Sequence, residues 1–122
     1  MKRCLLLSDI DRALPMTIRD LVEQSYEQAK KSGWTEREVP IPEMIALIHS
    51  EASEALECYR KGEAISWTDE TGKPQGIASE FADILIRIGH YSFLLRIDLE
   101  EEVKRKLEYN ATRPHRHGGK LA

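Results

Sequence analysis

The sequence contains few cysteines and no long apolar run near its N-terminus. Its two cysteines, Cys4 and Cys58, lie far apart in a chain of 122 residues and form no Cys-x-x-C pair, which argues against a disulfide framework and against a zinc knuckle. The longest apolar run near the N-terminus covers residues 4–7, whereas a signal-peptide core needs roughly 7 to 15 apolar residues and a membrane span roughly 20. We therefore expect a cytoplasmic protein with reduced thiols and no membrane partner.

The net charge is also low, but the first 103 residues and the last 19 carry net charges of opposite sign. The formal net charge is −3, yet residues 1–103 carry 12 basic and 20 acidic side chains, whereas residues 104–122 carry 6 basic and 1 acidic. The acidic body disfavours binding to a nucleic-acid backbone, so we expect no nucleic-acid partner, while the basic end suits a small polyphosphate. A mass of 14.0 kDa predicts one domain, over residues 17–114, between an N-terminal arm (1–16) and a basic C-terminal tail (115–122).

Four segments show the apolar spacing of helices, and glycine and proline separate them. The first begins at a capping box formed by Thr17 and Asp20 and stops before Gly33, and the second begins at Pro40 and ends before Gly62. Residues 63–76 contain poor helix formers and predict a loop. The third helix is expected over about residues 77–97.

The fourth helix begins at a second capping box, formed by Asp98 and Glu101, and ends at Arg113, which precedes a proline. Its expected inner stripe consists of Leu99, Val103 and Leu107. These segments predict an all-α fold, a four-helix bundle. The helix over 77–97 is apolar nearly all round, so we also expect an oligomer, a homodimer or homotetramer, that covers it further.

Carboxylates occupy positions where the helices should be apolar. Glu51 and Glu54, spaced i and i+3, lie at the edge of the apolar face of the second helix. On the third helix one narrow sector carries four ionisable residues, which are Glu80, Asp83, Arg87 and His90.

If these two faces meet, four carboxylates converge in a partly buried space. Each pair of carboxylates about 6 Å apart would repel by roughly 3 kcal/mol at an effective dielectric constant of about 20. Such a cluster must take up protons or bind cations, and two Mg²⁺ ions would supply the four positive charges that balance it. Two readings stay open: Arg87 and His90 neutralise the acids in a structural network, or they take part in catalysis.

The pattern Glu51-x-x-Glu54, then 25 residues, then Glu80-x-x-Asp83 resembles the signature of the MazG-like all-α nucleoside triphosphate pyrophosphohydrolases. The closing segment Lys106-Leu-Glu-Tyr-Asn110-x-x-Arg113-Pro, followed by His117-Gly-Gly-Lys, is similar to that of small bacterial and phage members. The resemblance covers about residues 17–120.

This resemblance implies hydrolysis of a (deoxy)nucleoside triphosphate between its α and β phosphates, to a nucleoside monophosphate and pyrophosphate, as nucleotide-pool house-cleaning. It implies Mg²⁺, with Mn²⁺ as a substitute, held by the catalytic carboxylates Glu51, Glu54, Glu80 and Asp83. One of these four, more naturally a glutamate of the second helix, could instead act as the general base for the attacking water.

The resemblance also suggests which residues contact the substrate. Lys106, Asn110 and Arg113 are assigned to the phosphates and the sugar, and Trp34 to the nucleobase, with Trp67 as the alternative aromatic. Charged donors near a leaving pyrophosphate fit this role, although cations near a helix C-terminus are also favoured by the helix dipole alone.

Three other functions are compatible with the same pattern. A phosphoribosyl-ATP pyrophosphohydrolase would use nearly the same chemistry, but the closing segment fits the MazG-like branch better. A non-catalytic helical interaction module would keep the acidic residues only as a surface. A di-iron bundle would usually carry Glu-x-x-His pairs, and the expected helices have none.

Overall fold

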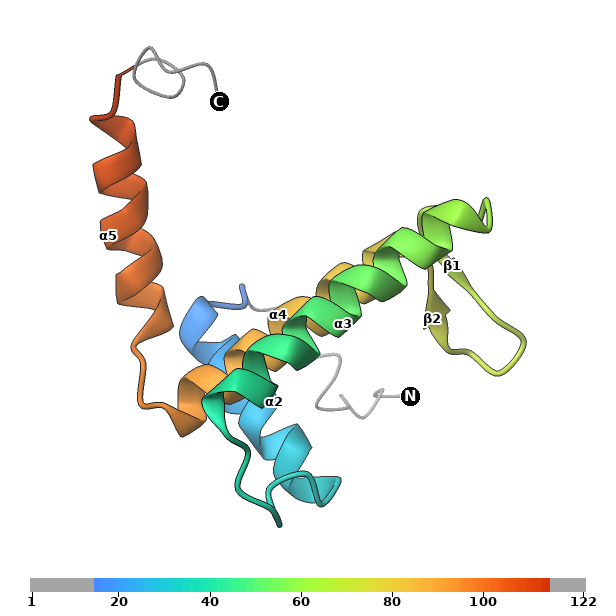
Figure 1. Cartoon of the computed structure of the whole chain (residues 1–122), viewed down its shortest axis with the longest axis horizontal. Helices are drawn as coiled ribbons and strands as arrows, with labels where there is room; N and C mark the ends of the chain where they lie inside the picture. The colour runs from blue at the N-terminus through green and yellow to red at the C-terminus, as the bar shows by residue number, and fades with distance from the viewer. Residues whose placement is uncertain (1–14, 115–122) are drawn as a thin grey trace, which may run out of the picture.

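The computed structural model describes residues 15–114, and within them the chain is almost entirely helical (Figure 1). The helices are α2 (Ile18–Lys31), α3 (Ile41–Arg60), α4 (Ile77–Leu94) and α5 (Leu99–Ala111), and the two strands are β1 (Trp67–Thr68) and β2 (Pro74–Gln75). The expected all-α class is confirmed. Residues 1–14 of the expected N-terminal arm and the whole expected tail, 115–122, lie outside the described residues.

The ends of α2 follow from local chemistry. Thr17 accepts a hydrogen bond from the Asp20 N–H at 3.0 Å, and the Asp20 carboxylate accepts one from the Thr17 N–H at 3.0 Å, so the expected capping box is present. Gly33 follows the helix with φ 78°, a conformation that glycine adopts without strain. The first helix therefore begins and ends where the sequence predicts.

Backbone geometry also sets the ends of α3 and α4. Proline at position 42 occupies the first turn of α3, where its missing N–H has no partner to lose. Gly76 precedes α4 with φ 96°, and a Cβ there would lie 2.5 Å from the Ile65 carbonyl oxygen. The prediction for the end of α4 was too long, because the helix stops at Leu94 and Arg96 adopts a left-handed φ of 58°.

Helix α4 is the centre of the fold, with α2 and α3 packed against it (Figure 1). At the crossing of α2 and α4, a Cβ on Gly89 would lie 2.8 Å from the Ser25 Oγ, so glycine allows the two helices to approach closely. The buried apolar side chains come from these three helices and are Val22, Ala29, Met44, Ala55, Cys58 and Tyr91.

Helix α5 differs from the expected fourth member of a bundle. It meets α2 at its first turn, where Arg19 pairs with Asp98 at 3.2 Å and with Glu100 at 2.7 Å, and from there it is directed away from α3 and α4 (Figure 1). Asp98 caps the helix by accepting a hydrogen bond from the Glu101 N–H. The expected inner stripe is only partly covered, since Leu107 is 63% exposed.

Two further expectations are altered by the structure. The predicted loop at 63–76 contains a short antiparallel hairpin, in which Trp67 pairs with Gln75 and Thr68 with Pro74. Helix α4 is less covered than expected, because Phe81 is 59% and Leu85 54% exposed in the single chain. None of the helices between residues 15 and 114 has both the length and the apolar character needed to span a membrane.

Candidate functional site

Three glutamates from two helices converge at one point. Glu51 and Glu54 of α3 and Glu80 of α4 each offer a carboxylate oxygen, and these oxygens lie within 4.8 Å of one another. Glu51 is buried, Glu80 is half-buried and Glu54 is exposed. We call these three residues the glutamate cluster. Its spacing follows from the i, i+3 pair on α3 and from the packing of α3 against α4.

The charges in the cluster are unevenly compensated. Burial and then the neighbouring Glu54, Asp83 and Glu51 carboxylates raise the pKa of Glu80 to about 7. Burial also opposes ionisation of Glu51, but hydrogen bonds, above all from Arg87, outweigh it and leave the pKa of Glu51 below its ordinary value. In the absence of a cation, Glu80 is therefore protonated in about half of the molecules at pH 7, while the lowered pKa of Glu51 favours its ionised form.

Two buried oxygens of the cluster have no partner. Glu51 Oε2 and Glu80 Oε2 are enclosed, and neither makes a hydrogen bond to any residue in the described range 15–114. Glu51 is only 7% exposed, so its free oxygen is not satisfied by bulk water. Buried polar atoms without partners are uncommon. The donors in the cluster are all carboxylate oxygens, which is the ligand type that Mg²⁺ and Mn²⁺ prefer, so these residues fit such a cation.

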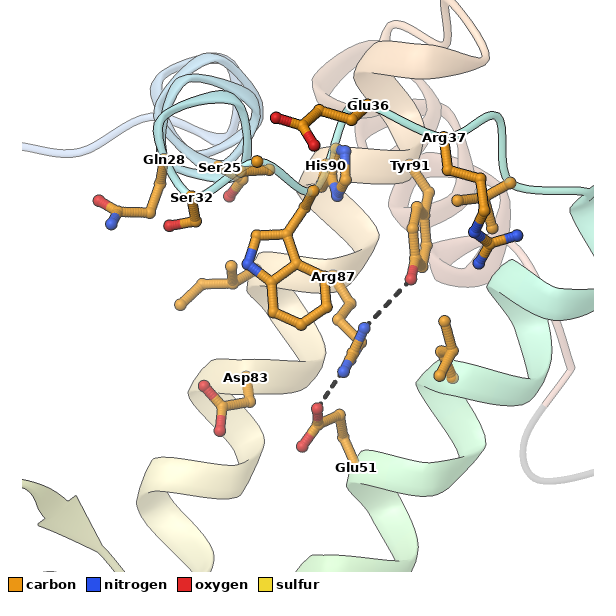
Figure 2. A pocket seen from close by; sticks show the side chains of 16 residues that line it. Ser25, Gln28, Ser32, Glu36, Arg37, Glu51, Asp83, Arg87, His90 and Tyr91 are labelled. Carbon is orange, nitrogen blue, oxygen red and sulfur yellow. Dashed lines mark hydrogen bonds and ion pairs between the residues drawn. The ribbon is translucent and has the colours of Figure 1, made fainter.

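Asp83, the fourth carboxylate of the sequence pattern, does not belong to the cluster of three. It lines a cavity beside the cluster, and burial and then the Glu51 charge raise its pKa. Figure 2 shows Asp83 and Glu51 approaching one end of this cavity from α4 and α3 respectively. Three of the four expected carboxylates are thus brought together, and the fourth lies nearby on the cavity wall.

The cavity has a volume of about 600 Å³ and lies between the C-terminal half of α2, the connection to α3, and the facing sides of α3 and α4. Its wall is largely apolar and includes Ala29, Leu47 and Ile86. Trp34 also lines it and is 66% exposed, so the indole ring is available for contact. A cavity of this size and character is typical of a site for a small organic ligand.

Arg87 connects the cavity to the glutamate cluster. Its Nε donates a hydrogen bond to Glu51 Oε1 at 2.7 Å, and its Nη1 donates one to the Tyr91 hydroxyl at 3.2 Å (Figure 2). The sequence left open whether Arg87 neutralises acids or takes part in catalysis, and the ion pair with Glu51 supports at least the first role. Tyr91 was missed, although its position four residues after Arg87 on the same helix was a usable signal.

His90 and the second tryptophan have different surroundings. His90 lines the cavity, and burial and then the Arg87 charge lower its pKa, which favours the neutral imidazole. Trp67 donates a hydrogen bond to Glu63 at 3.0 Å and lies in β1, outside the cavity lining. Of the two tryptophans, Trp34 is the one placed at the cavity.

The expected phosphate ligands on α5 and just after it lie apart from the glutamate cluster. Lys106, Asn110 and Arg113 are exposed, and none of the three lines the cavity. The Lys106 Nζ lies 5.5 Å from the centroid of the Tyr109 ring, on α5 itself. Within one chain, the structure therefore does not bring these three residues to the carboxylates.

Comparisons with protein-family models, with curated proteins and with solved structures give no match to this chain. The likeness to the MazG-like family therefore stays a prediction from the spacing of the four carboxylates and from the closing segment.

Proposed function

We propose that this protein is a Mg²⁺-dependent nucleoside triphosphate pyrophosphohydrolase of the MazG-like type. The observation that supports this most is the glutamate cluster, because three carboxylates from two helices lie within 4.8 Å and two of their buried oxygens lack partners. Without a cation, only a carboxyl proton shared among the three glutamates is available to these oxygens, whereas a divalent cation would pair with both of them. The three residues of the cluster are also three of the four carboxylates in the sequence pattern that resembles the family.

The proposed cation is held by Glu51, Glu54 and Glu80, with Asp83 completing the set next to the cavity. Bound Mg²⁺ supplies Lewis-acid stabilisation of the negative charge on phosphoryl oxygens and makes a coordinated water more acidic. Cation binding would favour the ionised form of Glu80, because a metal ligand must be deprotonated. One of these four carboxylates, more naturally a glutamate of α3, would act as general base for the attacking water instead of binding the cation.

The cavity is proposed to take the nucleoside part of the substrate. Its wall is largely apolar, Trp34 presents an exposed ring for stacking, and the end nearest the cluster carries Asp83 and Arg87. A nucleotide bound in this orientation would have its phosphates beside the cation. Hydrolysis between the α and β phosphates then yields a nucleoside monophosphate and pyrophosphate.

We further propose that the protein acts as a homodimer or homotetramer in which Lys106, Asn110 and Arg113 serve the glutamate cluster of a neighbouring copy. Two observations support this: α5 is directed away from its own cluster, and several large apolar side chains on α4 and α5 are exposed. The latter include Phe81 at 59%, Leu107 at 63% and Tyr109 at 60% exposed.

The decisive experiment is a panel of ordinary and modified (d)NTPs, together with phosphoribosyl-ATP, incubated with Mg²⁺ and assayed separately for pyrophosphate and for phosphate. We expect pyrophosphate release from at least one (d)NTP. Release only from phosphoribosyl-ATP would support the related enzyme instead, and no release with either Mg²⁺ or Mn²⁺ would support a non-catalytic interaction module.

A matched pair of variants tests the site within that assay. Glu54→Gln removes a charge from the glutamate cluster, whereas Glu57→Gln removes the same charge one turn later on α3, where Glu57 pairs with Arg60 at 3.5 Å on an exposed surface. Glu54→Gln should abolish pyrophosphate release and Glu57→Gln should retain it. Full activity of Glu54→Gln would refute the metal-site assignment.

A further inference from the structure

Arg87 has more hydrogen-bond donors than its partners use. A guanidinium group carries five N–H bonds. In this structure Nε donates to Glu51 and Nη1 donates to Tyr91, whereas Nη2 makes no hydrogen bond to any residue between 15 and 114. The side chain is 28% exposed and lines the cavity, so the unused donors are accessible from it.

The other arginine at the cavity is different. Both Nη atoms of Arg37 donate to the carboxylate of Glu43, at 3.0 and 2.8 Å, and Nη1 also donates to the Glu38 carbonyl oxygen at 3.5 Å. Its charge is therefore already matched by a carboxylate of its own. Arg87 differs from Arg37 in its burial, because its side chain is 28% exposed against 65% for Arg37, and in its ion pair with a member of the glutamate cluster.

The pairing of Glu51 allows Arg87 and a cation to be present together. Arg87 occupies only Oε1 of the Glu51 carboxylate, at 2.7 Å, and Oε2 is the buried oxygen that lacks a partner. Because one oxygen faces the arginine and the other is left for a cation, cation binding does not require the ion pair to break. The carboxylate would then lie between two positive groups.

We infer that Arg87 binds a phosphate group of the substrate with its unused N–H donors while its Nε continues to hold Glu51. This inference rests on the proposed function, because it takes the phosphates to lie between the glutamate cluster and the cavity. A planar guanidinium group offers paired donors that match two phosphate oxygens, which a lysine cannot reproduce. The structure thus provides a phosphate-binding cation within the same chain, in addition to the α5 cations expected from the sequence.

The test compares Arg87→Gln, Arg87→Lys and a charge-matched control, Arg60→Gln, in the full chain. Arg60 has a 70% exposed side chain and pairs with Glu57. Mn²⁺ binding without phosphate is measured by electron paramagnetic resonance, and binding of the magnesium complex of inorganic triphosphate by calorimetry. Steady-state pyrophosphate release from the preferred (d)NTP gives kcat and KM separately.

We expect Arg87→Gln to bind Mn²⁺ at least as tightly as the wild type, because a positive charge beside the cluster has been removed. Its affinity for inorganic triphosphate should fall about tenfold or more, as for loss of a hydrogen bond between charged groups, with a matching rise in KM. Arg87→Lys should recover part of the affinity, and Arg60→Gln should behave as the wild type.

Two results would overturn the inference without touching the proposed function. Equal triphosphate affinity in Arg87→Gln and the wild type would show that Arg87 does not contact phosphate. A joint loss of Mn²⁺ affinity and of thermal stability would show that Arg87 only supports Glu51. Failure of the proposed function has a different signature, namely a wild-type protein that neither binds Mn²⁺ nor releases pyrophosphate.

Discussion

The glutamate cluster and the basic side chains at the end of the chain differ in how far the fold positions them. The cluster is assembled by the packing of α3 on α4, partly buried, and held on one side by a 2.7 Å ion pair to Arg87. Lys106 of α5 and Arg113 just after it are exposed on a segment that leaves the core after its first turn. A single chain therefore brings its proposed cation ligands together by itself, whereas the proposed phosphate ligands Lys106 and Arg113 would act on the cluster of a neighbouring copy.

The strongest way to break this contrast is to remove a carboxylate from the cluster. Glu80→Gln should reduce Mn²⁺ affinity and pyrophosphate release by more than the roughly 100-fold that loss of a residue supporting a metal ligand can cause. The metal-free variant should be at least as stable as the wild type, because the amide removes repulsion from Glu54, Asp83 and Glu51. Mn²⁺ titration and thermal unfolding measure the two effects. Activity near the wild-type level would contradict the prediction.

The separateness of α5 can be tested by subunit complementation. The double variant Lys106→Gln, Arg113→Gln should raise KM by at least roughly 10- to 100-fold, which is the range for losing a single hydrogen bond to a charged group. If α5 serves a neighbouring copy, mixing this variant with inactive Glu54→Gln should restore activity, because mixed oligomers contain one intact combination. If the mixtures have no more activity than the sum of the separate variants, the α5 residues do not act on the glutamate cluster of a neighbouring copy.

A substitution outside the proposed site tests how closely α2 and α4 must pack. Gly89→Ala would place a Cβ 2.8 Å from the Ser25 Oγ at the crossing of α2 and α4. Overpacking of this kind typically lowers the free energy of unfolding by about 1–3 kcal/mol. Denaturant unfolding measures this loss. Gly62→Ala cannot serve as the control, because Gly62 has φ 71° and alanine would be strained in that conformation. Unchanged stability would mean that α2 can shift at little cost.

The smallest expected effect is a pH dependence of the metal-free protein. The pKa of Glu80 is raised to about 7 from an ordinary 4.5, so its protonated form stabilises the fold. That contribution is complete below about pH 4.5 and is lost as the pH rises through 7, and the raised pKa of Asp83 acts in the same direction. His90 opposes this slope, because its lowered pKa adds stability as the pH rises through its ordinary value of 6.5. The contribution of Glu80 is therefore measured as the difference in thermal stability between the wild type and Glu80→Gln, which should fall as the pH rises from 4.5 to 7. A difference that does not fall over that range would contradict the assignment.

The sequence predicted the helical architecture because its signals are local. Capping at Thr17 and Asp98, proline at position 42 and glycine at 33, 62 and 76 fix most helix ends through neighbouring residues alone. The early end of α4 was missed because Arg96 adopts a left-handed conformation that residues of its type rarely adopt. The short hairpin was missed because a pairing of two residues per strand leaves no periodic pattern.

The candidate site was predictable in part for a similar reason. The i, i+3 spacing placed Glu51 beside Glu54 and Glu80 near Asp83, and helical geometry then required only that α3 and α4 face each other. The sequence could not predict which carboxylate would join Arg87, since that depends on side-chain conformation across two helices. It also could not predict the direction of α5, which depends on the four connecting residues 95–98 rather than on the pattern of the helix itself.

The left-handed turn at Arg96 lies at the joint between α4 and α5, so a small rotation there produces a large displacement at the far end of α5. The 13 residues of α5 extend about 20 Å at about 1.5 Å per residue, so a rotation of about 10° at the joint displaces the far end by roughly 3.5 Å. That displacement is longer than a hydrogen bond. The position of the Arg113 guanidinium group therefore depends on the backbone angles of residues 95–97, although these residues lie far from Arg113 along the chain.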